Sequence, residues 1–115
     1  MADSILRDKA KDFAKAVVIL CRDMKLKHKE SVLINQLLRS ATSIGANLHE
    51  AQYAQSTNDF ISKLEIALKE ATETKYWLRL LNATEYLSDT EFNSIYTDCS
   101  ELEKLLVAIV KSTKK

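Results

Sequence analysis

The 115-residue sequence contains one glycine and no proline, whereas average usage of about 7% and 5% would supply roughly eight and six. Tight turns depend on these residues, because glycine tolerates positive φ and proline presets φ near −65°. The shortage argues against β-sandwiches, barrels and glycine-rich phosphate loops. It favours a fold of a few long elements joined by a few short connections.

Cysteine and long apolar runs are also scarce. Cys21 and Cys99 lie far apart and outside any CxxC motif, so we expect small core residues of a cytoplasmic protein rather than a redox pair. The longest apolar runs, 16–20 and 105–110, are far shorter than a membrane span, and the acidic start is unlike a signal peptide. We expect one cytoplasmic domain covering residues 1–115, with no membrane partner.

Apolar residues recur at three- and four-residue steps along almost the whole chain, the period of an amphipathic α-helix. Four such stripes predict helices near residues 4–26, 31–54, 58–83 and 89–112. Short connections make sequential helices antiparallel neighbours, so we expect an all-α fold, an antiparallel up-down-up-down four-helix bundle. The predicted core stripes are Leu6, Ala10, Phe13, Val17, Leu20 and Met24; Ile34, Leu37, Leu38, Ala41, Ile44, Leu48 and Ala51; Phe60, Leu64, Ala67, Ala71, Thr74, Leu78 and Leu81; and Phe92, Ile95, Cys99, Leu102, Leu106 and Ile109.

Polar residues at the expected helix starts support these boundaries. Ser88 and Glu91 have the spacing of a capping box, in which each side chain accepts a hydrogen bond from the other residue's backbone N–H. For the other helices, the expected caps are Asp3 or Ser4, Ser31 or Lys29-Glu30, and the Ser56–Asp59 segment.

The only glycine, Gly45, falls inside the second predicted helix, where it costs about 1 kcal/mol relative to alanine. Ala41, Ser43 and Ala46 surround it with small side chains. We interpret this bare surface as a place where another helix backbone comes close, in preference to a hinge. On that interpretation, Gly45→Leu overpacks the contact.

A second, polar stripe lies roughly opposite the apolar face of the same helix, and a matching row follows on the third helix. Trp77, and Arg39 beside small residues such as Ser43, favour a subunit interface, because aromatic residues and arginine are enriched at protein–protein contacts. The alternative is that the charges are ordinary surface groups and that Trp77 covers a broad core. The residues of the two rows are Arg39, Ser43, Asn47 and Glu50, and Glu70, Glu73 and Trp77.

Charge is uneven along the chain. The net charge is +1, but residues 1–29 carry eight Lys or Arg against four Asp. This basic first helix is either a solvated face that complements an acidic neighbour, which we favour, or a contact surface for the nucleic-acid backbone. The candidate contacts, with Arg7 beside them, are Lys9, Lys11, Lys15, Arg22, Lys25, Lys27 and Lys29.

Enzyme motifs are missing from the sequence. Neither histidine, His28 or His49, follows a glutamate by three residues, as di-iron bundles require. His49-Glu50 begins like a zinc-protease motif, but Tyr53 occupies the place of the second histidine. We expect no catalytic residue, metal, cofactor or small-molecule substrate.

The segment 39–51 resembles the signature R-x-A-x-S-I-x-x-N-I-x-E-G/A of a known family, and Asp59, Phe60, Leu64 and Ala67 match its D-F-x-x-x-L-x-x-A helix. Glu73 falls at the family's third-helix glutamate. The family is named for reading frames in intervening sequences of bacterial 23S ribosomal RNA genes, and the similarity runs from about residue 13 to 110. His49 occupies a position that is usually small, and Ala51 replaces the more frequent glycine, so the second helix is expected to run further.

This resemblance implies a bacterial, cytoplasmic bundle that forms a homo-oligomer, typically a pentamer, in which Arg39, Asn47, Glu50 and Glu73 orient contacts between helices and subunits. The family is similar to accessory proteins of diversity-generating retroelements, which bind nucleic acid and a reverse transcriptase. We therefore expect a non-enzymatic, homo-oligomeric scaffold. The alternative is an RNA- or DNA-binding, or reverse-transcriptase-associated, accessory protein that uses the basic first helix.

Overall fold

Four α-helices make up almost the whole chain in the computed structural model, which describes residues 2–114 and the side chains from Ser4 onward. They are α1 (Ala2–Lys27), α2 (Val32–Ala51), α3 (Thr57–Ala83) and α4 (Asp89–Lys114). Connections of four or five residues join them, and none of the residues 2–114 lies in a strand.

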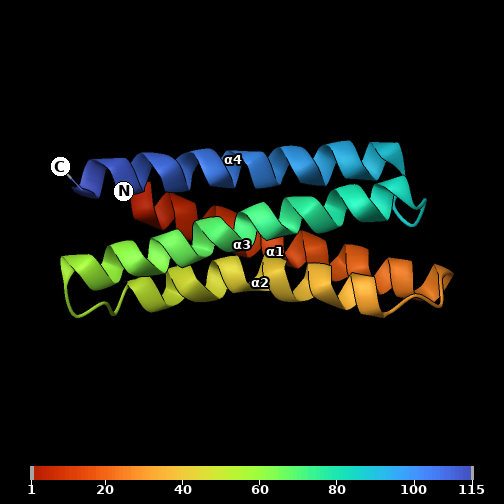
Figure 1. Cartoon of the computed structure of the whole chain (residues 1–115), viewed down its shortest axis with the longest axis horizontal. Coiled ribbons are helices and arrows are strands. Elements are labelled where there is room, and N and C mark those ends of the chain that lie inside the picture. Colours follow the sequence, from red (N-terminus) through yellow and green to blue (C-terminus); the bar gives the residue numbers. More distant parts are fainter. Residues whose placement is uncertain (1, 115) are drawn as a thin grey trace.

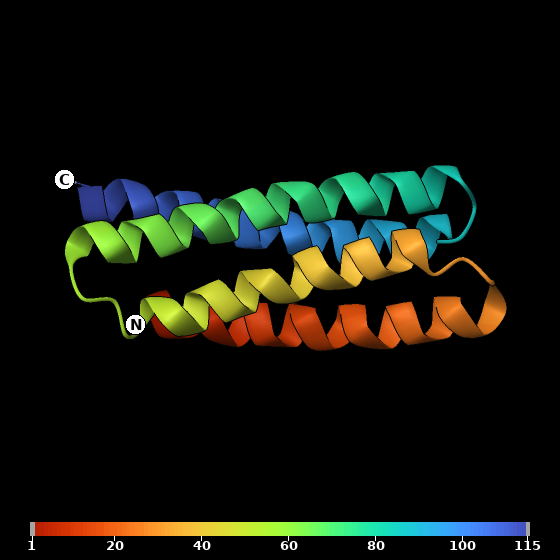
Figure 2. The ribbon, with the colours of Figure 1, turned by 60° about the horizontal axis from the view of Figure 1, so that its bottom comes forward.

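Each helix runs antiparallel to the next, so the chain passes up, down, up and down along a rod of 45 × 21 × 19 Å (Figure 1). Both α1 and α3 pack against α2 and α4, which places the helices at the corners of a square. Figure 2, turned from the first view, shows α2 crossing beside α1 at an angle, with the two ribbons nearer at the end of α2 than at its start. The predicted all-α, antiparallel four-helix bundle is confirmed.

One core runs the length of the rod, and the predicted stripes supply most of it. The stripe of α1 is corrected at one position, where Cys21 is buried and the predicted Leu20 is only partly buried. A step of four from Val17 stays closer to the buried face than a step of three, because each residue turns the helix by about 100°. In α4, Val110 is buried while Phe92 and Ile109 lie at the edge, as Leu38 and Phe60 do in α2 and α3.

The two cysteines are buried core residues, as predicted. Cys21 Sγ lies 3.7 Å from the Ile34 carbonyl oxygen, and Cys99 Sγ lies 3.5 Å from that of Ala71. Burial raises the pKa of the Cys21 thiol to about 11 and that of Cys99 to about 12. Both thiols therefore stay protonated at neutral pH and are poor nucleophiles.

Two predicted N-terminal caps are present. The Glu91 N–H donates to Ser88 Oγ at 3.2 Å, and the Ser88 N–H donates to Glu91 Oε1 at 3.3 Å, which completes the capping box. Ser56 accepts from the Asp59 N–H at 3.1 Å at the start of α3. Both helices therefore begin within one residue of the predicted position.

The start of α2 uses one of the two predicted signals. The side chain of Ser31 makes no capping bond, and Glu30 instead accepts from the Leu33 N–H at 2.8 Å. At α1 the serine prediction is wrong, because the helix already begins at Ala2 and the Ser4 hydroxyl accepts from the Arg7 side chain at 3.1 Å. The Asp3 side chain lies outside the described side chains.

The end of α2 corrects the expectation of a longer helix, since α2 stops at Ala51 rather than residue 54. The N–H groups of Gln52, Tyr53 and Ala54 donate to carbonyls three residues back, those of His49, Glu50 and Ala51, at 3.0–3.3 Å. These tighter turns satisfy the last carbonyls of the helix without continuing it.

The end of α3 is closed by a residue in the left-handed conformation, Glu85, with φ of 69°. Its N–H donates to the Asn82 carbonyl at 3.1 Å, and the Tyr86 N–H donates to the Leu81 carbonyl at 3.0 Å. These two bonds form a Schellman motif, in which glycine is the usual left-handed residue.

Glu85→Gly is therefore expected to stabilise the protein by about 0.5–1 kcal/mol. A left-handed residue with a Cβ costs about 1–2 kcal/mol, and the greater freedom of glycine in the unfolded chain offsets part of the gain. Chemical denaturation at fixed protein concentration measures the change. Lys104→Gly, at an exposed position inside α4, is the control and should cost about 1 kcal/mol; a lower midpoint for Glu85→Gly would contradict the prediction.

Candidate functional site

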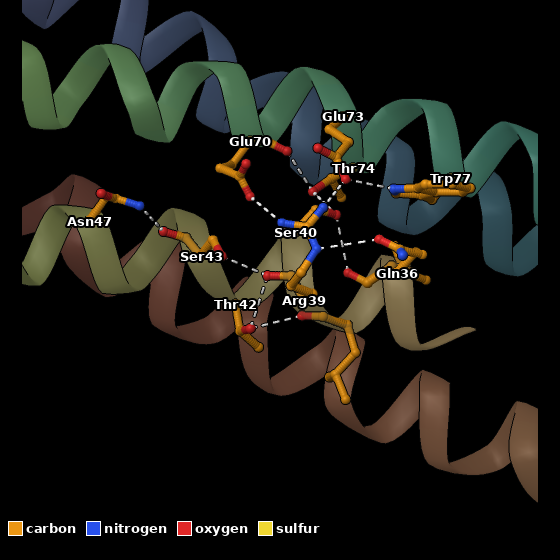
Figure 3. A network of polar contacts seen from close by, with 12 residues as sticks. Gln36, Arg39, Ser40, Thr42, Ser43, Asn47, Glu70, Glu73, Thr74 and Trp77 are labelled. Carbon is orange, nitrogen blue, oxygen red and sulfur yellow. Dashed lines mark hydrogen bonds and ion pairs between the residues drawn. The ribbon is translucent and has the colours of Figure 1, made fainter. Parts of the chain in front are cut away.

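Arg39 of α2 joins a polar network with α3 (Figure 3). Its guanidinium forms ion pairs with Glu70, at 3.2 Å, and with Glu73, and it donates to Gln36 at 3.3 Å. Glu73 Oε2 also accepts from the indole N–H of Trp77 at 2.9 Å. The structure thus brings four of the predicted site residues together within one chain.

Exposure differs across this network. The side chain of Arg39 is 50% exposed, that of Glu73 is 35% exposed and that of Glu70 is 15% exposed. One cation faces two carboxylates, so the centre of the network has one surplus negative charge, open to solvent on the Arg39 side.

A buried polar contact beneath this network is absent from the sequence predictions. Thr74 Oγ1 lies 2.9 Å from Ser40 Oγ, and both residues are fully buried. Ser40 Oγ donates to the Leu37 carbonyl at 3.3 Å, and the Thr74 hydroxyl has two acceptors within reach for its one proton, Ser40 Oγ and the Glu70 carbonyl at 2.8 Å. Thr74 was predicted in the apolar stripe of the third helix, and Ser40 was not singled out. The signal that could have predicted the contact is a serine and a threonine at buried positions of two neighbouring helices.

The remaining residues of the polar stripe on α2 are not part of the ion-pair cluster. Ser43 Oγ donates to the Arg39 carbonyl, and the Asn47 side-chain amide donates to the Ser43 carbonyl, both at 2.8 Å. Glu50 pairs instead with Lys63 of α3 at 3.0 Å, and this contact raises the pKa of the lysine. The stripe therefore supports the α2–α3 contact within the chain at two separate points.

Large apolar side chains surround the network on the surface, and we call this surface the α2–α3 face. Tyr76 is 59% exposed and packs edge-on against the half-buried Trp77, with ring centroids 5.0 Å apart. Ile66 is 41% exposed and precedes Glu73 by seven residues, two helical turns, so it follows the same row. Val32, 68% exposed, lies at the start of α2, beside the end of the antiparallel α3. The α2–α3 face is thus a polar centre with apolar residues on both sides.

Gly45 lies on a different side of α2, against α1. A Cβ built on Gly45 would lie 4.0 Å from the Ala10 carbonyl oxygen, with no other atom nearer than that. The α1 backbone does lie beside the glycine, but at ordinary contact distance. The contact has room for a Cβ, and overpacking by the larger side chain of leucine stays a prediction.

Replacing Gly45 with alanine is accordingly expected to stabilise the protein by about 1 kcal/mol, through helix propensity alone. The melting temperature should rise by about 4 °C. Ala46→Gly, at the next and exposed position of α2, is the matched control and should give a similar decrease. A fall in melting temperature for Gly45→Ala would show that the α1–α2 contact is tighter than the structure indicates.

Gly45 forms part of the floor of an open groove of about 470 Å³ between α1 and α2, the α1–α2 groove. Nine side chains or backbone segments line it. They are Arg7, Asp8, Lys11 and Ala14 of α1, and Thr42, Gly45, Ala46, His49 and Gln52 from α2 and its end. The α2 wall contributes no carboxylate to this lining, and Asp8 is the one acidic residue in it.

Five cations of α1 follow the side of the helix that faces α2. Arg7 and Lys11 line the groove, and Lys25 donates to Asn35 of α2. Lys15 and Arg22 continue the row at helical spacing between them. Among the residues that the structure describes, none of these five forms an ion pair with a carboxylate.

The other predicted cations lie elsewhere. Lys9 is 3.9 Å from Glu101 of α4, on the opposite side of α1. Lys27 follows Lys9 by five helical turns and so lies on that same side, and Lys29 lies in the connection after α1. The structure thus divides the predicted basic surface into a row on the side of α1 that faces α2, of which Arg7 and Lys11 line the groove, and three lysines outside this row.

Comparison with protein families gives a match over residues 2–108 to the model described as 23S rRNA-intervening sequence protein. The chain belongs to the 23S rRNA-intervening sequence protein family. A solved structure is 50% identical, with a TM-score of 0.94 over 96% of this chain and 99% of that one. It is a protein of unknown function from the S23 ribosomal protein family of Bacteroides thetaiotaomicron. No curated protein matches significantly.

The family description names no catalytic activity, and the solved relative is described as a protein of unknown function. Within the described part of this family member, no three His, Cys, Asp or Glu side chains are grouped so as to hold a metal ion. No helix in residues 2–114 combines the length and the apolar character needed to cross a membrane. The arrangement presents two surfaces, the α2–α3 face and the α1–α2 groove.

Proposed function

We propose that this member of the 23S rRNA-intervening sequence family is a non-catalytic scaffold that assembles with copies of itself through the α2–α3 face. The observation that carries the proposal is the pair of apolar faces on α3. One face fills the core, with Trp77 partly buried at its edge, and Ile66 and Tyr76 lie outside it at the surface. Two apolar faces on one helix are typical of a helix that packs against two partners.

The composition of the α2–α3 face fits a subunit contact. Tyrosine, tryptophan and arginine are the residues most enriched at the energetic centres of interfaces. Arg39 and Trp77 are already oriented by Glu73, so little side-chain freedom remains to be lost on association. The surplus carboxylate charge beside Arg39 can accept a cation of the neighbouring copy. A ring of five copies is the assembly that the family resemblance implies.

Sedimentation or light scattering of the untagged protein tests this proposal. The expected mass is a multiple of the 13.1 kDa chain, with five copies as the proposed number. Ile66→Glu combined with Tyr76→Glu should give monomers, because both side chains are exposed in one chain and a buried charge opposes association. Ile19→Glu, 53% exposed on α1, is the control and should leave the mass unchanged. A monomeric wild-type protein would refute the proposal.

A second candidate function is binding of RNA or DNA along the α1–α2 groove, alone or beside a reverse transcriptase. It is favoured by the five cations on this side of α1 and by the absence of carboxylates from the groove-lining residues of α2. Several identical basic rows in one oligomer would act together and strengthen weak binding.

Filter binding at about 50 and 200 mM salt tests this candidate, because five phosphate contacts imply a roughly 500-fold loss of affinity between these concentrations. Lys11→Gln with Lys15→Gln should weaken retention strongly. Lys9→Gln with Lys27→Gln removes the same charge outside the groove and should have a smaller effect. No retention at the lower salt concentration would exclude nucleic-acid binding.

A further inference from the structure

Two aromatic rings lie at one end of the α1–α2 groove. His49 lines the groove, and its ring packs against that of Tyr53 with centroids 5.6 Å apart. Tyr53 is 72% exposed and lies just beyond the end of α2, where its N–H donates to the Glu50 carbonyl at 3.0 Å. Gln52 lies beside His49, with its side-chain nitrogen 3.4 Å from the ring.

The same end of the groove contains the first two cations of the basic row. Arg7 and Lys11 line it together with His49, so the row begins beside the aromatic pair. From Arg7 to Lys25 the row follows 18 residues of α1, a nearly straight path of about 27 Å. Asp8 is the one carboxylate along the groove, and it leaves the positive charge in excess.

We propose that the α1–α2 groove is a binding site for single-stranded nucleic acid, with the phosphates along the cations of α1 and a base stacked on the exposed ring of Tyr53, which His49 supports edge-on at an angle of 62°. The proposal rests on the second candidate function and adds the strand class and the stacking residue. A positive groove beside exposed aromatic rings is the arrangement by which proteins bind single strands without sequence preference. At about 3.4 Å per nucleotide of a stacked strand, a path of about 27 Å corresponds to about eight nucleotides, within the range of about 4–16 for such sites.

The exposed ring favours a single strand over a duplex. A duplex keeps its bases inside the stack, and only its backbone and base edges are accessible. The stacking surface of Tyr53 would then remain unused, whereas an unpaired base presents a face that any aromatic ring can cover. The small residues Gly45 and Ala46 keep the groove floor low beside this ring, so a backbone can lie close to α2.

Fluorescence anisotropy of the full-length protein with three labelled probes of equal length tests the proposal. The probes are a single-stranded RNA, the same RNA in duplex form, and an abasic phosphodiester chain that has the phosphates without bases. Wild-type protein should bind the single strand most tightly. Tyr53→Ala should weaken single-strand binding by about 5- to 150-fold and leave binding of the abasic chain unchanged. Tyr53→Phe keeps the ring and should retain wild-type affinity.

The outcomes separate this inference from the function on which it rests. Equal losses on the single strand and the abasic chain, or no loss for Tyr53→Ala, would overturn the stacking site while groove binding of phosphates stands. Failure of all three probes to bind would overturn both. If Lys11→Gln with Lys15→Gln lowers the oligomeric mass and no probe binds, the groove is occupied by a second copy of the chain, which also overturns the proposal.

Discussion

Replacing Ile44 with alanine should lower the free energy of unfolding by about 2–5 kcal/mol, the largest effect that we expect from a single substitution. Ile44 is fully buried in α2, so the change removes apolar contacts from all sides and leaves a cavity that the surrounding side chains fill incompletely. At about 4 °C per kcal/mol, the melting temperature should fall by roughly 8–20 °C.

The chain offers a matched control for this prediction. Ile19 is also a helical isoleucine, but its side chain is 53% exposed on α1. Ile19→Ala should change the stability by less than about 0.5 kcal/mol, since the improved helix propensity of alanine offsets the small loss of buried area. Equal losses at the two positions, measured at one protein concentration, would mean that the helices are rotated relative to this structure or that Ile19 is buried by another copy.

Arg39→Glu is expected to have the second largest effect, a loss of about 2–3 kcal/mol. The change replaces an attraction by a repulsion and puts three carboxylates together on the α2–α3 face, one of them on the 15%-exposed Glu70. Full Coulomb energies near a surface would be larger, about 4 kcal/mol for a close pair, but the half-exposed position of Arg39 calls for a smaller value. Urea denaturation measures the loss.

Salt and two further variants separate charge from packing in that result. High salt, about 1 M, should recover part of the loss because it screens charges beyond about 3 Å. Arg39→Met keeps the apolar stem and should cost about 1 kcal/mol. Lys63→Glu reverses the other α2–α3 ion pair, in which Glu50 is 56% exposed, and should cost less than Arg39→Glu. A loss for Arg39→Glu that is independent of salt would contradict the electrostatic explanation.

The fold could be predicted from the sequence because the information it needs is local. A run such as Leu64, Ala67 and Ala71 defines a helix face from spacing alone, and Ser88 with Glu91 marks a helix start within four residues. The end of α2 was not predicted correctly, because it depends on whether the N–H groups of residues 52–54 donate to carbonyls three or four residues back. The left-handed Glu85 was missed for a similar reason, since glutamate is not a residue from which a Schellman motif is expected.

The network was only partly predictable, because a helical wheel gives the side of each helix but not the register between two helices. Arg39, Glu70 and Glu73 were each identified as members of polar rows. Their ion pairs follow from the alignment that places Ser40 opposite Thr74, and long side chains then span the remaining gap. Whether the same residues also contact another copy depends on atoms outside one chain, so the subunit interface stays a prediction.

The arrangement of the helices is compatible with circular permutation of the chain. In Figure 1, α4 ends at the end of the rod where α1 begins, and α1 packs against α4 as well as against α2. A short linker from the end of α4 to the start of α1 would close the polypeptide into a circle of four antiparallel neighbours. New ends could then be opened in the connection 28–31, at the opposite end of the rod from the start of α1, the end of α4 and the connection that contains Tyr53.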